Sequence, residues 1–218
     1  YFPKREIVTY DYVAESKDLP YERIETLNKM QEMRTGVVIT TIEAVLQKMI
    51  SKKALYKNTL NFKVGDSENL ETIKQKLVEL GYVRCDLIEG RGQFSVRGGI
   101  VDISVNEKEG VRLEFWGDEI DSIRYFNVVS QRSTENIDKI TIYPAHEYIL
   151  ESNIEDVITN IRNTIYSEKL QETIEQDIEL IKAGNYISKI DRYLNSFYTE
   201  QDTILDYITD KYLVFLDE

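Results

Sequence analysis

The sequence predicts an α/β fold that is interrupted by a small inserted β-rich domain, and three observations lead to this prediction. Residues 21–50 alternate between helix-like and strand-like hydrophobic spacing, which is typical of α/β proteins. From residue 82 to about residue 144, apolar residues recur instead at every second position, in short runs separated by polar turns. After Pro144 helical spacing returns. We therefore expect residues 1–59 and 146–218 to form one α/β domain, with residues 60–145 as an α+β domain inserted into it.

The first segment predicts a helix, a strand and a second helix. Apolar residues lie at near-helical spacing from Tyr21 to Met30, and the run VVIT at 37–40 predicts a short buried strand. Thr40 and Glu43 have the spacing of a capping box ahead of IEAVLQKMI. The opening stretch YFPKREIVTYDY resembles part of a strand and its loop, so we expect the chain to be cut from a longer protein.

The inserted segment predicts one helix followed by a small, mostly antiparallel sheet. Residues 67–81 combine acidic residues at the start, apolar residues at helical spacing and a final Gly81, with Ser67 as the expected N-cap. Glycine-containing or polar turns then separate five apolar runs. The expected strands are QFSV, GIVDISV, VRLEFW, EIDSIRYF and KITIY.

The third segment predicts two amphipathic helices and a final strand. Ser152 and Glu155 have capping-box spacing, and apolar stripes follow at 154–165 and 170–181. Such stripes are more often core than a groove for a partner. The closing YLVFLDE predicts a buried strand that ends in two carboxylates.

Charge and composition favour a protein partner. The 27 lysines and arginines are outnumbered by 39 aspartates and glutamates, so the formal net charge is -12, a field that repels nucleic acid. A single cysteine, Cys85, excludes an internal disulfide and is most often a packed residue. The single histidine, His146, has no second histidine with which to share a metal or a triad. With no apolar run of about 20 residues and no signal peptide, a cytoplasmic location is expected.

Two motifs could indicate enzymatic or metal chemistry, but each has a simpler explanation. YLVFLDE has the shape of a Walker B segment, with Asp217 and Glu218 as the acidic pair. However, no GxxxxGK[ST] accompanies it, so ATPase activity is not expected from these residues. Asp118, Glu119 and Asp121 could hold a cation, but their spacing is not that of an EF-hand and favours a polar turn. No metal or cofactor is therefore predicted.

The arginines around the predicted sheet are the best functional candidates. Arg97, Gly98 and Gly99 lead into a strand rather than a helix, so we interpret RGG as a tight turn and not a phosphate cradle. Arginine recognises carboxylates with two parallel hydrogen bonds and is enriched at protein interfaces. Arg84, Arg91 and Arg97 could therefore bind a partner, or they could pair locally with carboxylates such as Asp86, Glu89 and Glu114.

These residues carry a resemblance to a known family. The stretch from about residue 77 to residue 148, with GQFSVRGGIVDIS, VRLEFWGDEIDSIRYFNVVSQRS and IYPAHEY, resembles the second domain shared by UvrB and the transcription-repair coupling factors. The stretches TTIEAVLQ, SQRS and PAHEY are closer to the coupling factors (the Mfd family). The resemblance implies a degenerate helicase-like α/β domain, with an inserted domain that docks the damage-recognition ATPase UvrA.

The resemblance also implies the residues of this contact. UvrB-like sequences carry the contacting arginines in a pattern like YxR…FRVRG, and Arg84 in YVRC and Arg97 in FSVRG match two of the positions. Phe94, in the same FSVRG stretch, is assigned to the contact with them. Ser95 stands where UvrB has another arginine, and Ser104 stands where many relatives have phenylalanine.

A further departure concerns DNA. UvrB-like proteins carry a long tyrosine-rich hairpin that is used on damaged DNA. Here only VAESKDLP separates Tyr12 from Tyr21, which is too short for that hairpin. Little or no direct DNA binding is therefore expected.

The predicted function is a non-catalytic adaptor, the amino-terminal module of a transcription-repair coupling factor, that recruits UvrA to a stalled RNA polymerase. The polymerase would be bound by other regions of a full-length protein that is itself an ATP-dependent DNA translocase. One alternative is a UvrB-like ATP-dependent helicase subunit whose P-loop lies upstream of Tyr1. Another is a nucleic-acid-binding β domain, which the net charge of -12 disfavours.

Overall fold

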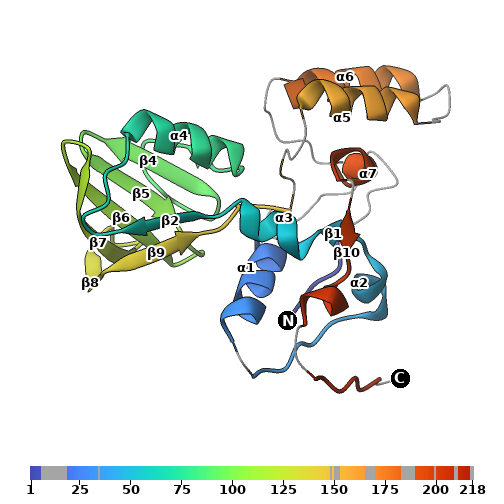
Figure 1. Cartoon of the computed structure of the whole chain (residues 1–218), viewed down its shortest axis with the longest axis horizontal. Coiled ribbons are helices and arrows are strands. Elements are labelled where there is room, and N and C mark those ends of the chain that lie inside the picture. Colours follow the sequence, from blue (N-terminus) through green and yellow to red (C-terminus); the bar gives the residue numbers. More distant parts are fainter. Residues whose placement is uncertain are drawn as a thin grey trace.

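The chain is mixed α/β and contains a six-stranded sheet, in agreement with the α/β class expected. The computed structural model describes residues 1–5, 19–33, 35–147, 149, 153–164, 170–182, 190–198, 200–208 and 211–216. The large sheet lies to one side of the molecule together with the helix α4, and the helices other than α4 lie away from the sheet, on what we call the helical side (Figure 1). The strands β2 (Leu60–Lys63) and β9 (Lys139–Ile142) form an antiparallel pair that lies along the sheet, and the end of the pair at Leu60 and Ile142 leads to the helical side.

The six-stranded sheet has the strand order β3-β4-β5-β6-β7-β8. All neighbouring strands are antiparallel, as expected, except that the two-residue edge strand β3 runs parallel to β4. The bounds are β3 (Val83–Arg84), β4 (Gln93–Arg97), β5 (Ile100–Ser104), β6 (Glu109–Trp116), β7 (Glu119–Asn127) and β8 (Ser133–Ile137).

One face of this sheet is covered by the helix α4 (Leu70–Glu79) and by β2 and β9. Every second residue of β4, β5 and β6 points into this core, as the period of two predicts, whereas in β7 the inward Ile120 and Ile123 are three residues apart because the register shifts there. The buried side chains include Ile73 and Leu77 of α4 together with Val101, Ile103, Val111 and Leu113 of the sheet. We call this side the core face.

The start of α4 differs from the prediction. Asn69 is the N-cap, since its side-chain oxygen accepts hydrogen bonds from the backbone N–H groups of Glu71 and Thr72. Ser67, the expected cap, lies instead in a β-bridge with Glu119. Because the backbone of Ser67 is extended and paired with Glu119, the helix begins later and Asn69 becomes its cap.

The helical side has its own core, to which chain segments distant in sequence contribute. Strands β1 (Met49–Ile50) and β10 (Gln201–Asp202) pair antiparallel. The other elements of this side are α1 (Leu19–Glu32), α2 (Ile42–Leu46), α3 (Lys52–Lys57), α5 (Ile154–Asn163), α6 (Gln171–Lys182), α7 (Leu194–Phe197) and the 3-10 helices Ile190–Tyr193 and Ile204–Tyr207. In Figure 1, α7 lies between the β1–β10 pair and the helices α5 and α6.

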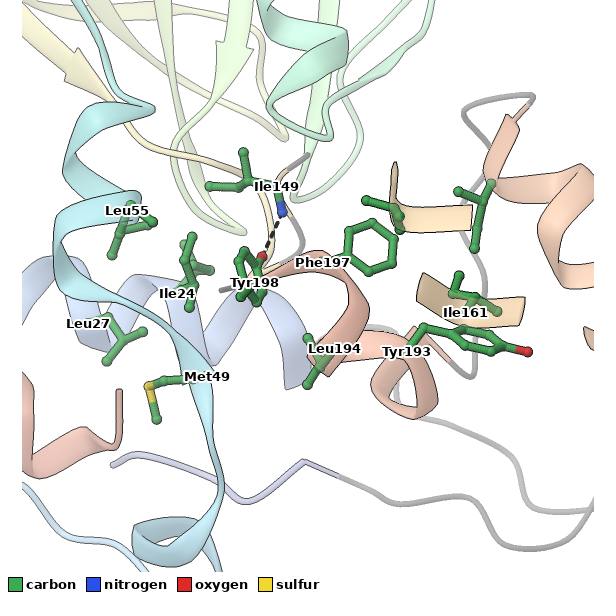
Figure 2. Close-up of a cluster of buried hydrophobic side chains, with 14 of the residues drawn as sticks. Ile24, Leu27, Met49, Leu55, Ile149, Ile161, Tyr193, Leu194, Phe197 and Tyr198 are labelled. Carbon is green, nitrogen blue, oxygen red and sulfur yellow. Dashed lines mark hydrogen bonds between the residues drawn. The ribbon is translucent and has the colours of Figure 1, made fainter. Parts of the chain in front are cut away.

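Figure 2 shows how this core is assembled. Ile24 and Leu27 of α1 lie in the same buried cluster as Ile161 of α5 and Phe197 of α7. The hydroxyl of Tyr198 accepts a hydrogen bond of 2.8 Å from the backbone N–H of Ile149, which follows β9 in the chain. The described residues of the two apolar stripes predicted in the third segment are thus core, as expected, whereas Ile165 lies outside the described residues.

Two predicted strands are absent from the described residues. Val37 and Ile39 are exposed and outside any strand, with only Thr40 in a single bridge to Phe2. Residues 211–216 are likewise exposed and not in a strand. Thr41, rather than Thr40, caps α2, because its side chain accepts from Ala44 N. The N-cap of α5 is Asn153, whose side-chain oxygen accepts from Glu155 N, and not Ser152 as predicted. The Asp217–Glu218 pair lies outside the described residues.

A buried ion pair joins Glu147, which follows β9 in the chain, to Arg23 of α1. The Arg23 guanidinium donates to both carboxylate oxygens of Glu147, and its Nη1 donates to the Pro3 carbonyl at 2.5 Å. Arg23 also stacks over the Phe2 ring, 4.1 Å from the centroid. Burial opposes ionisation of Glu147, but the charges of Arg23 and Arg5 outweigh it and hold the pKa of Glu147 below its usual value. The connection is therefore a charged contact without access to water.

Candidate partner-binding surface

The face of the sheet opposite the core is mainly polar over β4 to β7, apart from a small buried apolar cluster of Ile88, Phe126 and Val128. We define the polar face by Ser95, Arg97, Asp102, Arg112, Glu114, Ser122 and Arg124, which occupy the alternate positions of β4 to β7. The register places Ser95, Asp102, Arg112 and Arg124 in one row across the strands. Arg97, Ile100, Glu114 and Ser122 form the next row. The alternation that buries one set of residues thus collects the arginines on the other side.

Asp102 organises two of these arginines. Its side chain is 1% exposed, and its Oδ2 accepts a hydrogen bond of 2.8 Å from Arg97 Nη2. Arg112 donates to the same carboxylate twice, from Nε at 2.7 Å and from Nη2 at 2.9 Å. These bonds to Asp102 raise the pKa of Arg112, whose guanidinium also stacks over Phe126 at 5.0 Å. One buried negative charge therefore holds two positive charges, and the group carries a net charge of about +1.

The exposed end of this network is Arg97. Its side chain is 48% exposed, whereas that of Arg112 is 15% exposed. One Nη atom is held by Asp102, so the guanidinium is fixed in position while much of it faces water. Such an arginine can bind a carboxylate on another molecule at little further cost in side-chain entropy.

Glu114 organises the third arginine. It accepts a hydrogen bond of 2.8 Å from the Ser122 hydroxyl and another from Arg124 Nη2. Burial raises the pKa of Glu114, but the hydrogen bonds from Ser122 and Arg124 lower it further than burial raises it. Arg124 is thereby neutralised, so the positive charge of the polar face is concentrated around Asp102.

The RGG stretch is a tight turn, as predicted. Gly98 has φ of +60°, a left-handed conformation that favours glycine. A Cβ atom at Gly99 would lie 2.8 Å from the carbonyl oxygen of Phe115. Both glycines are therefore required by backbone geometry, and the turn brings the end of β4 close to the end of β6.

The structure does not bring Arg84 and Arg97 onto one face. Arg84 pairs with Phe94 in the parallel β3–β4 ladder and so points toward the core face, beside α4. In agreement with this position, Lys74 lowers the pKa of Glu71 on α4 and the charge of Arg84 adds to the effect. Phe94 itself is fully buried in the core. It supports the sheet from inside, and its side chain is not available for a surface contact.

Arg91 has a local role. Its guanidinium nitrogens lie 3.6 Å from a carboxylate oxygen of Glu22 and 3.5 Å from one of Glu25, both on α1. The local-pairing alternative thus describes Arg91, although its partners are not the carboxylates considered from the sequence. Arg97 also pairs locally, but with Asp102 and with half of its side chain left exposed.

The remaining sequence candidates are structural. Cys85 packs against Ile88, Phe126 and Val128, and burial raises the pKa of its thiol. Asp118 lies in the turn between β6 and β7, where its carbonyl accepts from Glu68 N, as the turn interpretation predicts. In the described ranges, no three His, Cys, Asp or Glu side chains gather as a metal site. Among the described helices, none is long and apolar enough to cross a membrane.

Sequence reasoning missed one exposed residue. Trp116 is 84% exposed at the end of β6, yet it was treated only as part of an apolar run. In VRLEFW the inward residues are Val111, Leu113 and Phe115, so the alternation already assigns the tryptophan to the polar side.

Comparison with known proteins gives two results. Residues 60–148 match the model of the UvrB interaction domain. The whole chain is 29% identical over 231 residues to the transcription-repair-coupling factor of Bacillus subtilis strain 168, and covers 20% of that protein. It is 31% identical over 232 residues to the transcription-repair-coupling factor of Staphylococcus aureus strain MRSA252, again covering all of this chain and 20% of the relative. The chain therefore spans about a fifth of the length of the curated relatives it matches.

Proposed function

This chain is a UvrB-homology module of the transcription-repair coupling factor family, and from this premise we propose that it is a non-catalytic adaptor that docks UvrA. The observation that carries the proposal is Arg97, half-exposed and held in place by the buried Asp102. In this role the module brings UvrA to a stalled RNA polymerase that other regions of the longer protein bind.

Charge supports the choice of an acidic protein surface as the docking partner. The chain as a whole has a net charge of -12, yet the group around Asp102 is positive. A partner carboxylate that meets Arg97 gains charge-assisted hydrogen bonds without first having to order the arginine. The negatively charged surfaces elsewhere on the chain would repel an acidic partner and so direct it to this face.

We further propose that residues 60–145 form a domain that can act as a unit. The core face of the sheet and the core of the helical side are separate hydrophobic clusters. The two ends of the segment meet in the β2–β9 pair, where Leu60 lies opposite Ile142. A helicase-like origin for the surrounding α/β part remains a prediction from the resemblance.

The proposal is tested by titrating UvrA from the same organism into the wild-type chain and into three variants. Arg97→Ala should weaken binding by about 2 kcal/mol, roughly thirtyfold, as expected for an arginine at an interface hot spot. Arg162→Ala is the matched control, because Arg162 is an exposed arginine that pairs with Glu175 on the helical side. Circular dichroism and thermal unfolding check that each variant is folded.

Arg84→Ala tells how far the contact extends. If the partner touches the polar face alone, this variant binds as wild type, because Arg84 points toward the core face. Weakening by both Arg84→Ala and Arg97→Ala means that the partner wraps around the β3 edge. Absence of binding by the wild-type chain at tens of micromolar UvrA would refute the adaptor function.

A further inference from the structure

Trp116 is the most unusual exposed residue of the sheet domain. It is the single tryptophan of the chain and is 84% exposed. A side chain of this size buries 150–250 Å² when covered and is enriched at interface hot spots. The described structure offers no internal packing role that would explain a large aromatic ring at this position.

The alternation of β6 places Trp116 on the polar face. Phe115 packs against the core face, so its neighbour points to the opposite side, together with Arg112 and Glu114. Phe115 N donates to Gly99 O at 2.8 Å, which fixes the turn after Arg97 beside the end of β6. Trp116 and Arg97 therefore lie at the same end of the same face.

The backbone that carries Trp116 is fixed by hydrogen bonds. The segment 65–68 lies along the β6–β7 turn, with bonds from Gly65 N to Ile120 O, from Ile120 N to Asp66 O and from Glu68 N to Asp118 O, at 2.8, 2.9 and 2.8 Å. A tryptophan on a fixed backbone has only two side-chain torsions to immobilise. It can therefore be covered by a partner at a small entropic cost.

We propose that Trp116 is an apolar anchor residue of the partner contact, which inserts into an apolar recess beside the acidic groups that bind Arg97. This inference rests on the proposed docking of UvrA and adds a residue to that surface. The partner chemistry follows from the positive group around Asp102 next to an uncharged aromatic ring: carboxylates bordering an apolar pocket. The contact then extends along the polar face, away from Arg84.

The test compares Trp116→Ala with Val129→Ala in the UvrA titration. Val129 is 88% exposed in the turn at the other end of β7, so it controls for loss of an exposed apolar side chain. Trp116→Ala should weaken binding at least tenfold and leave the thermal unfolding midpoint unchanged, whereas Val129→Ala should bind as wild type. Wild-type affinity of Trp116→Ala, together with weakened binding by Arg97→Ala, would overturn the anchor and leave the adaptor function intact.

A second measurement observes the residue directly. Incorporation of 5-fluorotryptophan gives one fluorine resonance, because the chain has one tryptophan. Unlabelled UvrA should shift this resonance and remove its sensitivity to replacement of H₂O by D₂O. A resonance that stays solvent-sensitive under conditions where binding is saturated would refute the inference. Failure of wild type to bind at all would overturn both the adaptor function and the anchor.

Discussion

Two arginine–carboxylate networks in this molecule use the same chemistry in different surroundings. In the sheet domain, Asp102 holds Arg97 and Arg112. On the helical side, Glu147 holds Arg23 and lies 3.6 Å from Arg5. Each network places one buried carboxylate between two guanidinium groups. They differ in access to water, since Arg97 is half-exposed whereas the Arg23 side chain is fully buried.

This difference separates a structural ion pair from a recognition site. In the buried network around Glu147 the charges are paired with one another inside the protein, so removal of one partner leaves a buried charge uncompensated. In the open network the carboxylate fixes an arginine whose remaining hydrogen-bonding capacity faces outward. We therefore expect mutations in the first network to change stability, and mutations in the second to change binding.

The largest effect is expected for Glu147→Gln. The variant leaves Arg23 buried without a countercharge, and the free energy of unfolding should fall by about 3–5 kcal/mol. Chemical denaturation measures the change. At a temperature where the variant is folded, its UvrA affinity should equal that of wild type. A loss of binding without loss of stability would contradict the division between the two networks.

The contribution of Glu147 should also depend on pH. Its pKa is held below the ordinary value of 4.5, so its carboxylate stabilises the fold fully above that value. The stabilisation is lost as the pH falls through the lowered pKa of the folded state. The difference in unfolding free energy between wild type and Glu147→Gln should be constant from pH 7 to pH 5 and narrow below pH 4.5. A difference that persists unchanged under acidic conditions would show that charge is not its source.

Asp102→Asn should have a smaller effect that acts through Arg97. Without the carboxylate, Arg97 is no longer held, and we expect weaker UvrA binding with a coupling of about 1 kcal/mol to Arg97. A double-mutant cycle measures this: Asp102→Asn should change the affinity in the wild-type background and have little effect in the Arg97→Ala background. Equal effects in both backgrounds would mean that Asp102 does not act by positioning Arg97.

The smallest effect is expected for Arg162→Ala. Arg162 and Glu175 form a two-bonded pair between α5 and α6, with hydrogen bonds of 3.1 and 2.7 Å, but both side chains are about half-exposed. Exposed pairs are screened by water and salt, so neither the unfolding midpoint nor its salt dependence should change measurably. A clear loss of stability would show that geometry alone, without burial, makes an ion pair structural.

Much of the fold could be predicted because it follows from local patterns. The strands β4 to β7 have alternating apolar residues, and α5 and α6 have helical stripes, so their types were predicted from spacing alone. The two-residue β3 and the mostly exposed β8 carry no such pattern and were not predicted, and KITIY forms β9, which pairs with β2 instead of joining the large sheet. The wrong predictions concern residues whose structure depends on contacts with distant parts of the chain. Val37–Thr40 is apolar but stays outside any strand except for one bridge, and Ser67 pairs with Glu119 instead of capping α4. Neither contact leaves a local signal.

For the site, the residue types were predictable but their directions were not. Arg97 follows from the RGG turn, but its partner Asp102 was not among the carboxylates considered from the sequence. Arg84 could not be placed, because nothing in YVRC shows that β3 runs parallel to β4 and so points this side chain toward the core face. Phe94 is buried because it belongs to the apolar alternation of β4, together with Val96.

The pairing of distant strands also sets an order of events during synthesis. The sheet domain closes when Ile142 meets Leu60, and all of its strands have then emerged. The helical side closes only when Gln201 and Asp202 reach Ile50 and Met49. Contacts of such long sequence separation form slowly, and domains fold as units while the chain grows. We therefore expect residues 60–145 to fold once they have left the ribosome, while Met49 and Ile50 still await their partners, so that the polar face is complete before the helical side is.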